Sequence, residues 1–176
     1  KSKELEATFH VRHTKNPRKL DGKVYEPEWR TATPVIMRGG LQTEVRGLYD
    51  DENLHVAYTC EEPRREGPTG VDLVELFLDP EDTIEANRYY HFLAGATANA
   101  IQDLREGFEG LSSQDKTWNA PGFRYGFSKE PEKKMWSIEM VVPFKDIGTK
   151  APKDGDVWLG NHAREGASGL QQWSKG

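Results

Sequence analysis

The sequence predicts an all-β domain, namely an antiparallel β-sandwich of the immunoglobulin-like or jelly-roll type with short helical turns. Apolar and polar residues alternate along several segments with a period of two, which is the pattern of half-buried strands. No long stretch keeps the spacing of apolar residues that a helix requires. Clusters of Gly, Pro, Asn and Asp separate the alternating segments and indicate turns. Many short strands joined by turns are typical of two packed antiparallel sheets.

The expected strands follow one another along most of the chain. In the clearest, residues 54–60, alternate residues are apolar, and the acidic stretch 50–53 just before it forms the opening turn. Residues 71–78 are apolar on both faces, as a central strand would be, and Asp79-Pro80 ends them. Further strands are expected at 88–94, 123–127, 136–142 and 157–163, and helical turns at 27–32 and 143–147.

The length of 176 residues predicts a single domain, 1–176, with residues 1–16 as an N-terminal arm or edge strand. The sequence stops soon after Trp173 without a closing apolar strand, which predicts truncation or continuation into a further strand. Five Trp, six Tyr and seven Phe are too many aromatic residues for a disordered chain.

Charge and composition exclude several classes of partner. The net charge is −5 and the basic residues are scattered among acids, so we expect no nucleic-acid partner. The apolar runs are too short to span a membrane. Cys60 is the only cysteine, which excludes an internal disulfide and favours a buried, inert thiol. The GxSxG, HExxH, GxGxxG and GxxxxGK[ST] motifs are absent.

Glu75 is the most informative position, because counting by twos places it on one face with Val71, Leu73 and Phe77. A carboxylate in such a row needs a partner or a wet surface. It either accepts hydrogen bonds from sugar hydroxyls or forms a structural ion pair. For the ion pair we expect Arg164, at about 3 Å.

Two tryptophans are candidates for stacking on a sugar ring. Trp118 lies in a polar loop, where it either presents a face to solvent or folds back over the end of a sheet. If it is exposed, Trp118→Ala abolishes glycan binding and changes the free energy of unfolding by less than about 1 kcal/mol. Trp173, near the end of the sequence, is the second candidate.

Two further chemistries have weaker signals. Glu75 and Glu139 both lie in expected strands, and paired carboxylates on a jelly roll are the machinery of small glycosidases. Asp50 and Asp51 offer oxygen ligands for calcium, although their turn lacks the EF-hand spacing and can equally be a solvated turn. The five histidines do not form a metal motif.

A series of motifs, in order, resembles the family 9 carbohydrate-binding modules. They are Leu20-Asp21-Gly22-Lys23 with Glu26-Pro27-Glu28-Trp29, Leu48-Tyr49-Asp50-Asp51-Glu52-Asn53-Leu54-His55-Val56, Val74-Glu75-Leu76-Phe77-Leu78-Asp79-Pro80, Tyr89-Tyr90-His91-Phe92, Trp136-Ser137-Ile138-Glu139-Met140 with Pro143-Phe144, Gly155-Asp156-Val157-Trp158 with Asn161 and Arg164, and Trp173-Ser174. The resemblance implies a β-sandwich that accompanies secreted polysaccharide-degrading enzymes, with structural calcium in some members. Glu75 matches a ligand-binding glutamate of the family. The family's tryptophan six residues earlier is replaced by Thr69, and the nearest match to its arginine on the next strand is Leu93.

We therefore predict a non-catalytic carbohydrate-binding module of a secreted or periplasmic polysaccharide-active protein. Its partners would be a polysaccharide or oligosaccharide and the catalytic domains of the same parent protein. The sequence establishes no cofactor, and structural calcium is the one candidate. The ligand would stack on Trp118 or Trp173 and receive polar contacts from Glu75, Arg105, Asn161 and Arg164. The alternatives are a jelly-roll glycoside hydrolase that uses Glu75 and Glu139, and a purely structural accessory domain. The sequence does not name the glycan, the parent protein or the oligomeric state.

Overall fold

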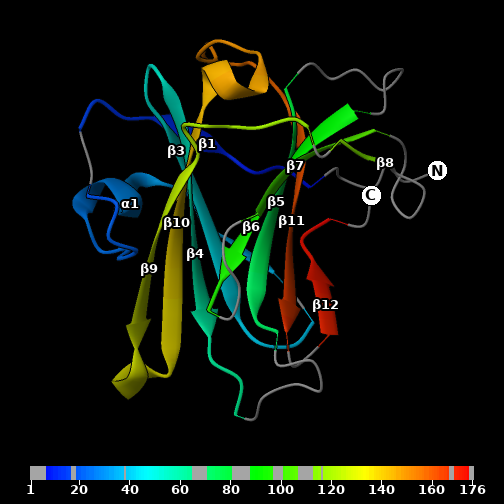
Figure 1. Ribbon diagram of the computed structural model, residues 1–176. Helices are drawn as coiled ribbons and strands as arrows, with labels where there is room; N and C mark the ends of the chain where they lie inside the picture. The colour runs from blue at the N-terminus through cyan, green and yellow to red at the C-terminus, as the bar shows by residue number, and fades with distance from the viewer. Residues whose placement is uncertain are drawn as a thin grey trace, which may run out of the picture.

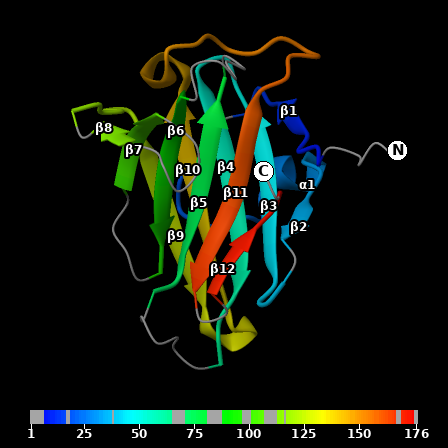
Figure 2. The same ribbon diagram turned by 90° about the vertical axis from the view of Figure 1, so that its right-hand side faces the viewer.

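A computed structural model describes residues 7–16, 19–37, 39–64, 71–80, 88–96, 101–106, 113–115, 117–166 and 169–174, with the backbone alone for 101–106 and 113–115. These residues form two sheets packed face to face (Figures 1 and 2), so the predicted β-sandwich is confirmed. None of the described helices has the length and apolar character of a membrane span.

The first sheet has the strand order β1-β3-β4-β10-β9, with β2 also paired to β3. Its strands are β1 (Val11–His13), β2 (Val35–Met37), β3 (Thr43–Tyr49), β4 (Asn53–Glu61), β9 (Arg124–Glu130) and β10 (Met135–Pro143). All pairs are antiparallel except β1 with β3. The polar N-terminal segment therefore supplies an edge strand, one of the two roles expected for it.

The second sheet has the order β12-β11-β5-β6-β7-β8, and every pair in it is antiparallel. Its strands are β5 (Leu73–Asp79), β6 (Arg88–Gly95), β7 (Ile101–Glu106), β8 (Ser113–Asp115), β11 (Leu159–Gly166) and β12 (Gly169–Gln172). The helical turns are α1 (Pro27–Thr31), η1 (Pro131–Lys133) and η2 (Phe144–Ile147). The expected central strand at 71–78 is β5, which lies between β11 and β6.

The main core fills the space between the sheets. Even-numbered residues of β5 and β10, such as Leu76 and Ile138, are buried there together with Phe92 and Tyr58. Cys60 is buried in the same core, and burial raises the pKa of its thiol to about 12, as expected of an inert cysteine.

A smaller cluster covers the outer face of the first sheet. The helix α1 places Trp29 over Leu48 and Ala57, and Figure 1 shows this helix beside the sheet. Beneath it, Glu139 accepts hydrogen bonds from Trp29 Nε1 (3.0 Å) and the Gly22 backbone N–H (2.9 Å). Gly22 has a φ of +78°, and a Cβ there would lie 2.3 Å from the Phe127 carbonyl carbon, so only glycine fits this close approach.

Candidate functional site

The face of the second sheet that points away from the core carries the odd-numbered residues of β5 and β6. Their even-numbered neighbours are core residues, and successive side chains of a strand alternate between faces. Phe77 lies directly opposite His91 and Glu75 directly opposite Leu93. We call Glu75, Phe77, Tyr89, His91 and Leu93 the β5–β6 face.

Glu75 is held in a fixed orientation by His91. The Nε2 atom of His91 lies 2.8 Å from Oε1 of Glu75, and the imidazole stacks on Phe77 with ring centroids 4.7 Å apart and planes 12° apart. The side chain of His91 is 2% exposed and that of Glu75 is 15% exposed. Within the described part of the chain, Oε2 of Glu75 makes no hydrogen bond, so this oxygen can accept one from a ligand.

The expected ion pair between Glu75 and Arg164 is wrong. Ala163, not Arg164, lies opposite Glu75, so the Arg164 side chain points to the other face of the sheet, into the core. There its Nε donates to Oδ1 of Asp72 (3.0 Å) and its Nη2 to Oδ2 (3.1 Å). Because Arg164 is fully buried, it cannot contact a ligand on the surface, and its role is structural.

Asn161 lies opposite Phe77, on the same outer face as Glu75, but its amide binds the C-terminal segment, whereas Trp173 packs on the core side. Asn161 Nδ2 donates to the Ser174 carbonyl (2.9 Å), and the Ser174 N–H donates back to Asn161 Oδ1 (3.0 Å). The Trp173 ring lies edge-on to Phe9 and His162, and it packs against the main core. Both groups of the Asn161 amide are therefore used within the chain.

Trp118 folds back over the sheet, the second of the two positions expected for it. Its ring is half-buried and lies 5.2 Å from the Tyr90 ring and 6.0 Å from the Phe92 ring, measured between centroids. The small stability cost expected of an exposed platform therefore does not apply to Trp118→Ala. Arg105 lies in β7 opposite Tyr89, and its side chain is outside the described residues.

Glu75 and Glu139 do not face one another. Glu75 lies on the outer face of the second sheet, whereas Glu139 is 3% exposed on the outer face of the first sheet, beneath α1. Both sheets and the core separate the two carboxylates. The predicted glycosidase pair is therefore wrong.

The expected calcium ligands have other partners in the structure. Oδ1 of Asp50 accepts the backbone N–H groups of Glu52 (2.8 Å) and Asn53 (2.7 Å), and Oδ2 lies 2.7 Å from Nε2 of His55. Although desolvation opposes it, these hydrogen bonds lower the pKa of the Asp50 carboxyl. Asp51 contacts His13 at 2.9 Å. The described residues include no cluster of three or more His, Cys, Asp and Glu side chains that could hold a metal.

We predict that a chelator leaves the melting temperature unchanged. A ligand that binds only the native state adds stability, so removal of a bound calcium ion would lower the melting temperature. Differential scanning fluorimetry with and without EDTA measures this directly. A fall in melting temperature that added calcium reverses would contradict the prediction and identify a cation site.

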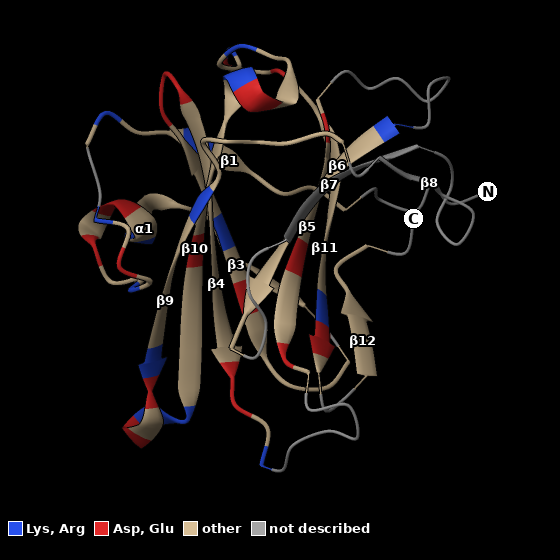
Figure 3. Cartoon of the chain, viewed as in Figure 1, with Lys and Arg blue, Asp and Glu red and all other residues tan. Residues whose placement is uncertain are grey.

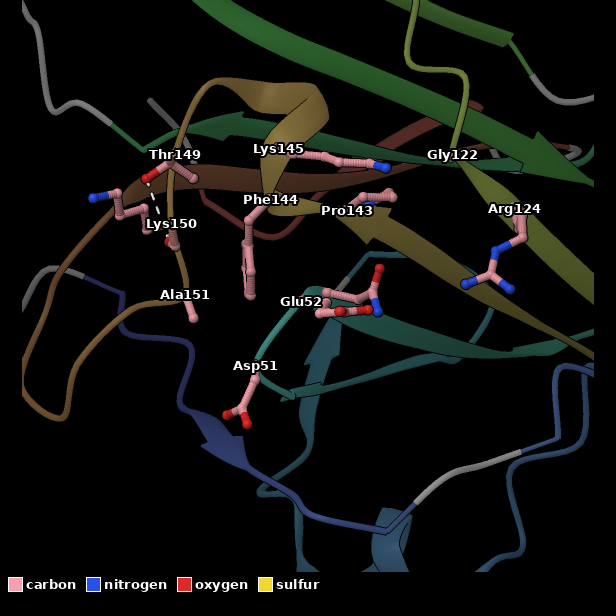
Figure 4. A pocket seen from close by; sticks show the side chains of 11 residues that line it. Asp51, Glu52, Gly122, Arg124, Pro143, Phe144, Lys145, Thr149, Lys150 and Ala151 are labelled. Carbon is pink, nitrogen blue, oxygen red and sulfur yellow. Dashed lines mark hydrogen bonds between the residues drawn. The ribbon is translucent and has the colours of Figure 1, made fainter.

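A second feature is a pocket of about 480 Å³ at one end of the sandwich. Figure 4 shows that its walls come from the turn before β4, the start of β9, and the segment from Pro143 to Ala151. Pro143 and Phe144 are buried beneath it, and Arg124, Lys145 and Lys150 lie at its rim. No pattern in the sequence indicates this pocket.

His91 was also not predicted as the partner of Glu75, although the alternation that placed Phe77 beside Glu75 extends across the strand pair to His91.

The sequence matches no family model and no curated protein. Among solved structures, the chain is similar to a carbohydrate-binding module family 9 from Caldicellulosiruptor kristjanssonii in complex with cellotriose, with a TM-score of 0.68 and 16% identity over 94% of this chain and 84% of that one. A glucose complex of a family 9 module from the same organism has a TM-score of 0.63 and 15% identity, over 93% of this chain and 85% of that one. A candidate carbohydrate-binding protein from Bacteroides uniformis ATCC 8492 has a TM-score of 0.61 and 15% identity, over 93% of this chain and 87% of that one. The chain therefore has the β-sandwich fold found in carbohydrate-binding modules of family 9.

Proposed function

We propose that the chain is a non-catalytic carbohydrate-binding module that binds an oligosaccharide on the β5–β6 face. The observation that carries the proposal is Glu75, a carboxylate fixed by His91 with one oxygen left available on the outer face of the sheet. The fold supports it, since two structures with the same fold contain cellotriose and glucose.

The chemistry of the face suits a sugar. A carboxylate accepts hydrogen bonds from hydroxyl groups, and charged acceptors bind more strongly than neutral ones. Phe77 and Tyr89 lie on the same face with ring centroids 6.0 Å apart and supply apolar surface for the C–H groups of a pyranose. Trp118 and Trp173 pack elsewhere, so the affinity rests on polar contacts more than on stacking.

We extend the proposal to the setting of the module. It would belong to a secreted or periplasmic protein that acts on polysaccharide, and its role would be to hold the catalytic domains of that protein near their substrate. The similarity of fold to modules in complex with cellotriose and with glucose is the support for this extension.

We predict that Glu75→Gln weakens the binding of cellotriose at least about tenfold. The substitution keeps the shape of the side chain but removes the charge, and a hydrogen bond to a charged group contributes about 1.5–3 kcal/mol. Isothermal titration calorimetry with cellotriose and glucose measures the loss.

The matched control is Glu165→Gln. Glu165 lies on β11, the neighbouring strand, opposite Leu73, and it is exposed on the same outer face. Glu165→Gln should bind as the wild type does. Equal binding by wild type and Glu75→Gln would disprove the role of Glu75, and no binding by the wild type would favour a purely structural domain.

A further inference from the structure

The pocket at the end of the sandwich carries a second set of polar side chains, and none of them belongs to the β5–β6 face. Figure 3 shows basic and acidic residues next to each other in η2, which lies at this end. Arg124 lies at the start of β9, Lys145 in η2, and Glu52 in the turn before β4. Within the described residues, neither Arg124 nor Lys145 has an ion-pair partner within 4 Å. Their charges are therefore available to a ligand.

The basic side chains of the pocket extend towards two different ends of it. Figure 4 shows the Lys145 amine and the Arg124 guanidinium extending towards the end where Glu52 lies, whereas Lys150 extends towards the opposite end. A guanidinium presents paired N–H donors that match the two oxygens of a carboxylate, and an ammonium adds a second positive charge. Glu52 adds an acceptor, which suits hydroxyl groups.

Backbone contacts hold the walls of the pocket in place. The Phe144 N–H donates to the Glu52 carbonyl (2.9 Å), and the Gly122 N–H donates to Oδ2 of Asp146 (2.8 Å). A Cβ at Gly122 would lie 2.6 Å from Cγ of Pro143, so the backbone at Gly122 packs closely against the Pro143 ring and leaves no room for a side chain. Because the walls are tied together, the charged side chains project from a preformed site, which reduces the entropy cost of binding.

We propose that this pocket binds a saccharide that carries a carboxylate, such as a uronic acid residue. Arg124 and Lys145 bind the carboxylate, Glu52 accepts hydroxyl hydrogen bonds, and Ala151 supplies apolar surface for the ring. The volume of about 480 Å³ lies within the range of small-molecule sites. The site goes beyond the proposed function, because it takes a charged ligand at a surface separate from the β5–β6 face.

The test compares matched ligands by calorimetry at low salt. We expect a galacturonic acid trisaccharide to bind, and the same trisaccharide with methyl-esterified carboxylates to bind at least about tenfold more weakly. Equal binding of both would overturn the proposal. Sodium phosphate and sodium acetate test for a general anion site, and displacement of the trisaccharide by either at equal concentration would also overturn it.

The variants test which residues are responsible. Arg124→Gln and Lys145→Gln should each weaken binding of the acidic trisaccharide about fivefold or more, whereas Lys150→Gln, which removes the same charge at the other end of the pocket, should change it less than about twofold. Equal losses in all three would show diffuse attraction rather than this site. Glu75→Gln should leave acidic binding unchanged, so the outcome is independent of the cellotriose experiment.

Discussion

Asp72→Ala is expected to lower the free energy of unfolding by about 3–5 kcal/mol, because it leaves a buried guanidinium without its counter-charge. Asp72 accepts two hydrogen bonds from Arg164 and a third from Trp136 Nε1 (2.8 Å). The side chain of Arg164 is 1% exposed and that of Asp72 is 9% exposed, so water cannot replace the lost partner. Removal of one member of such a pair costs far more than the pair contributes overall.

The matched control is an exposed pair in the same protein. Lys129 Nζ lies 2.6 Å from Oε1 of Glu62, with the Lys129 side chain 53% exposed. Lys129→Ala should cost less than about 1 kcal/mol, as exposed ion pairs usually do. Urea denaturation of both variants gives the two values. A cost for Asp72→Ala as small as that of Lys129→Ala would show that Arg164 finds water or another partner.

The second large effect concerns how the free energy of unfolding depends on pH. Glu139 and His162 are expected to change it in opposite directions. Burial raises the pKa of Glu139 to about 7, helped by the like charges of Glu26 and Asp21 and opposed by the hydrogen bonds from Trp29 and Gly22. Burial lowers the pKa of His162 to about 3. His162 is 3% exposed and its Nδ1 lies 2.9 Å from the Tyr58 hydroxyl.

The signs follow from which state binds more protons. The native state holds a proton on Glu139 more tightly than the unfolded state does. The stabilisation that Glu139 provides is therefore complete below pH 4.5 and is lost as the pH rises to about 7. The native state holds a proton on His162 less tightly than the unfolded state does, so the stabilisation that His162 provides is complete above pH 6.5 and is lost as the pH falls to about 3. Between pH 4.5 and 6.5 the two slopes oppose each other.

Single variants should separate the two slopes. With Glu139→Gln, stability should rise with pH between 4.5 and 6.5, and with His162→Gln it should fall over the same range. The Glu139 contribution amounts to about 3 kcal/mol over its full range, because one pKa unit corresponds to about 1.4 kcal/mol. Urea denaturation at half-unit pH steps measures both slopes. Parallel curves for the two variants would contradict the assignment.

The sequence allowed about half of the described strands to be predicted, because burial on one face gives a period of two. The expected strands at 54–60, 88–94 and 136–142 differ from β4, β6 and β10 by one residue at each end or less. Strands β2, β3, β7, β8 and β12 were not expected. For β7 and β8 the reason is that their sequences, Ile101–Glu106 and Ser113–Asp115, are mostly polar. The parallel pairing of β1 with β3 joins segments that are far apart in the sequence, and no local pattern indicates it.

The site was predicted only in part, for a related reason. Counting by twos identifies the residues that share a face within one strand, but it does not give the register between strands. That register places Ala163 opposite Glu75 and so sends Arg164 into the core, towards Asp72. In the same way, the polar neighbours of Trp118 left both an exposed and a folded-back position open, and its contacts with Tyr90 and Phe92 of β6 decide for the second.

The buried arginine also bears on how the two layers are aligned. From the second sheet, Arg164 donates to the carbonyl of Glu61 (2.7 Å) and to the hydroxyl of Thr43 (3.0 Å), both in the first sheet. Apolar contacts between sheets are non-directional and tolerate small shifts of one sheet relative to the other. The N–H groups of the planar guanidinium have fixed directions, so their hydrogen bonds do not tolerate such shifts. The offset of one layer relative to the other is therefore specified at this point by geometry rather than by burial. If an apolar pair replaced Asp72 and Arg164, stability could be kept while the single alignment of the layers was lost.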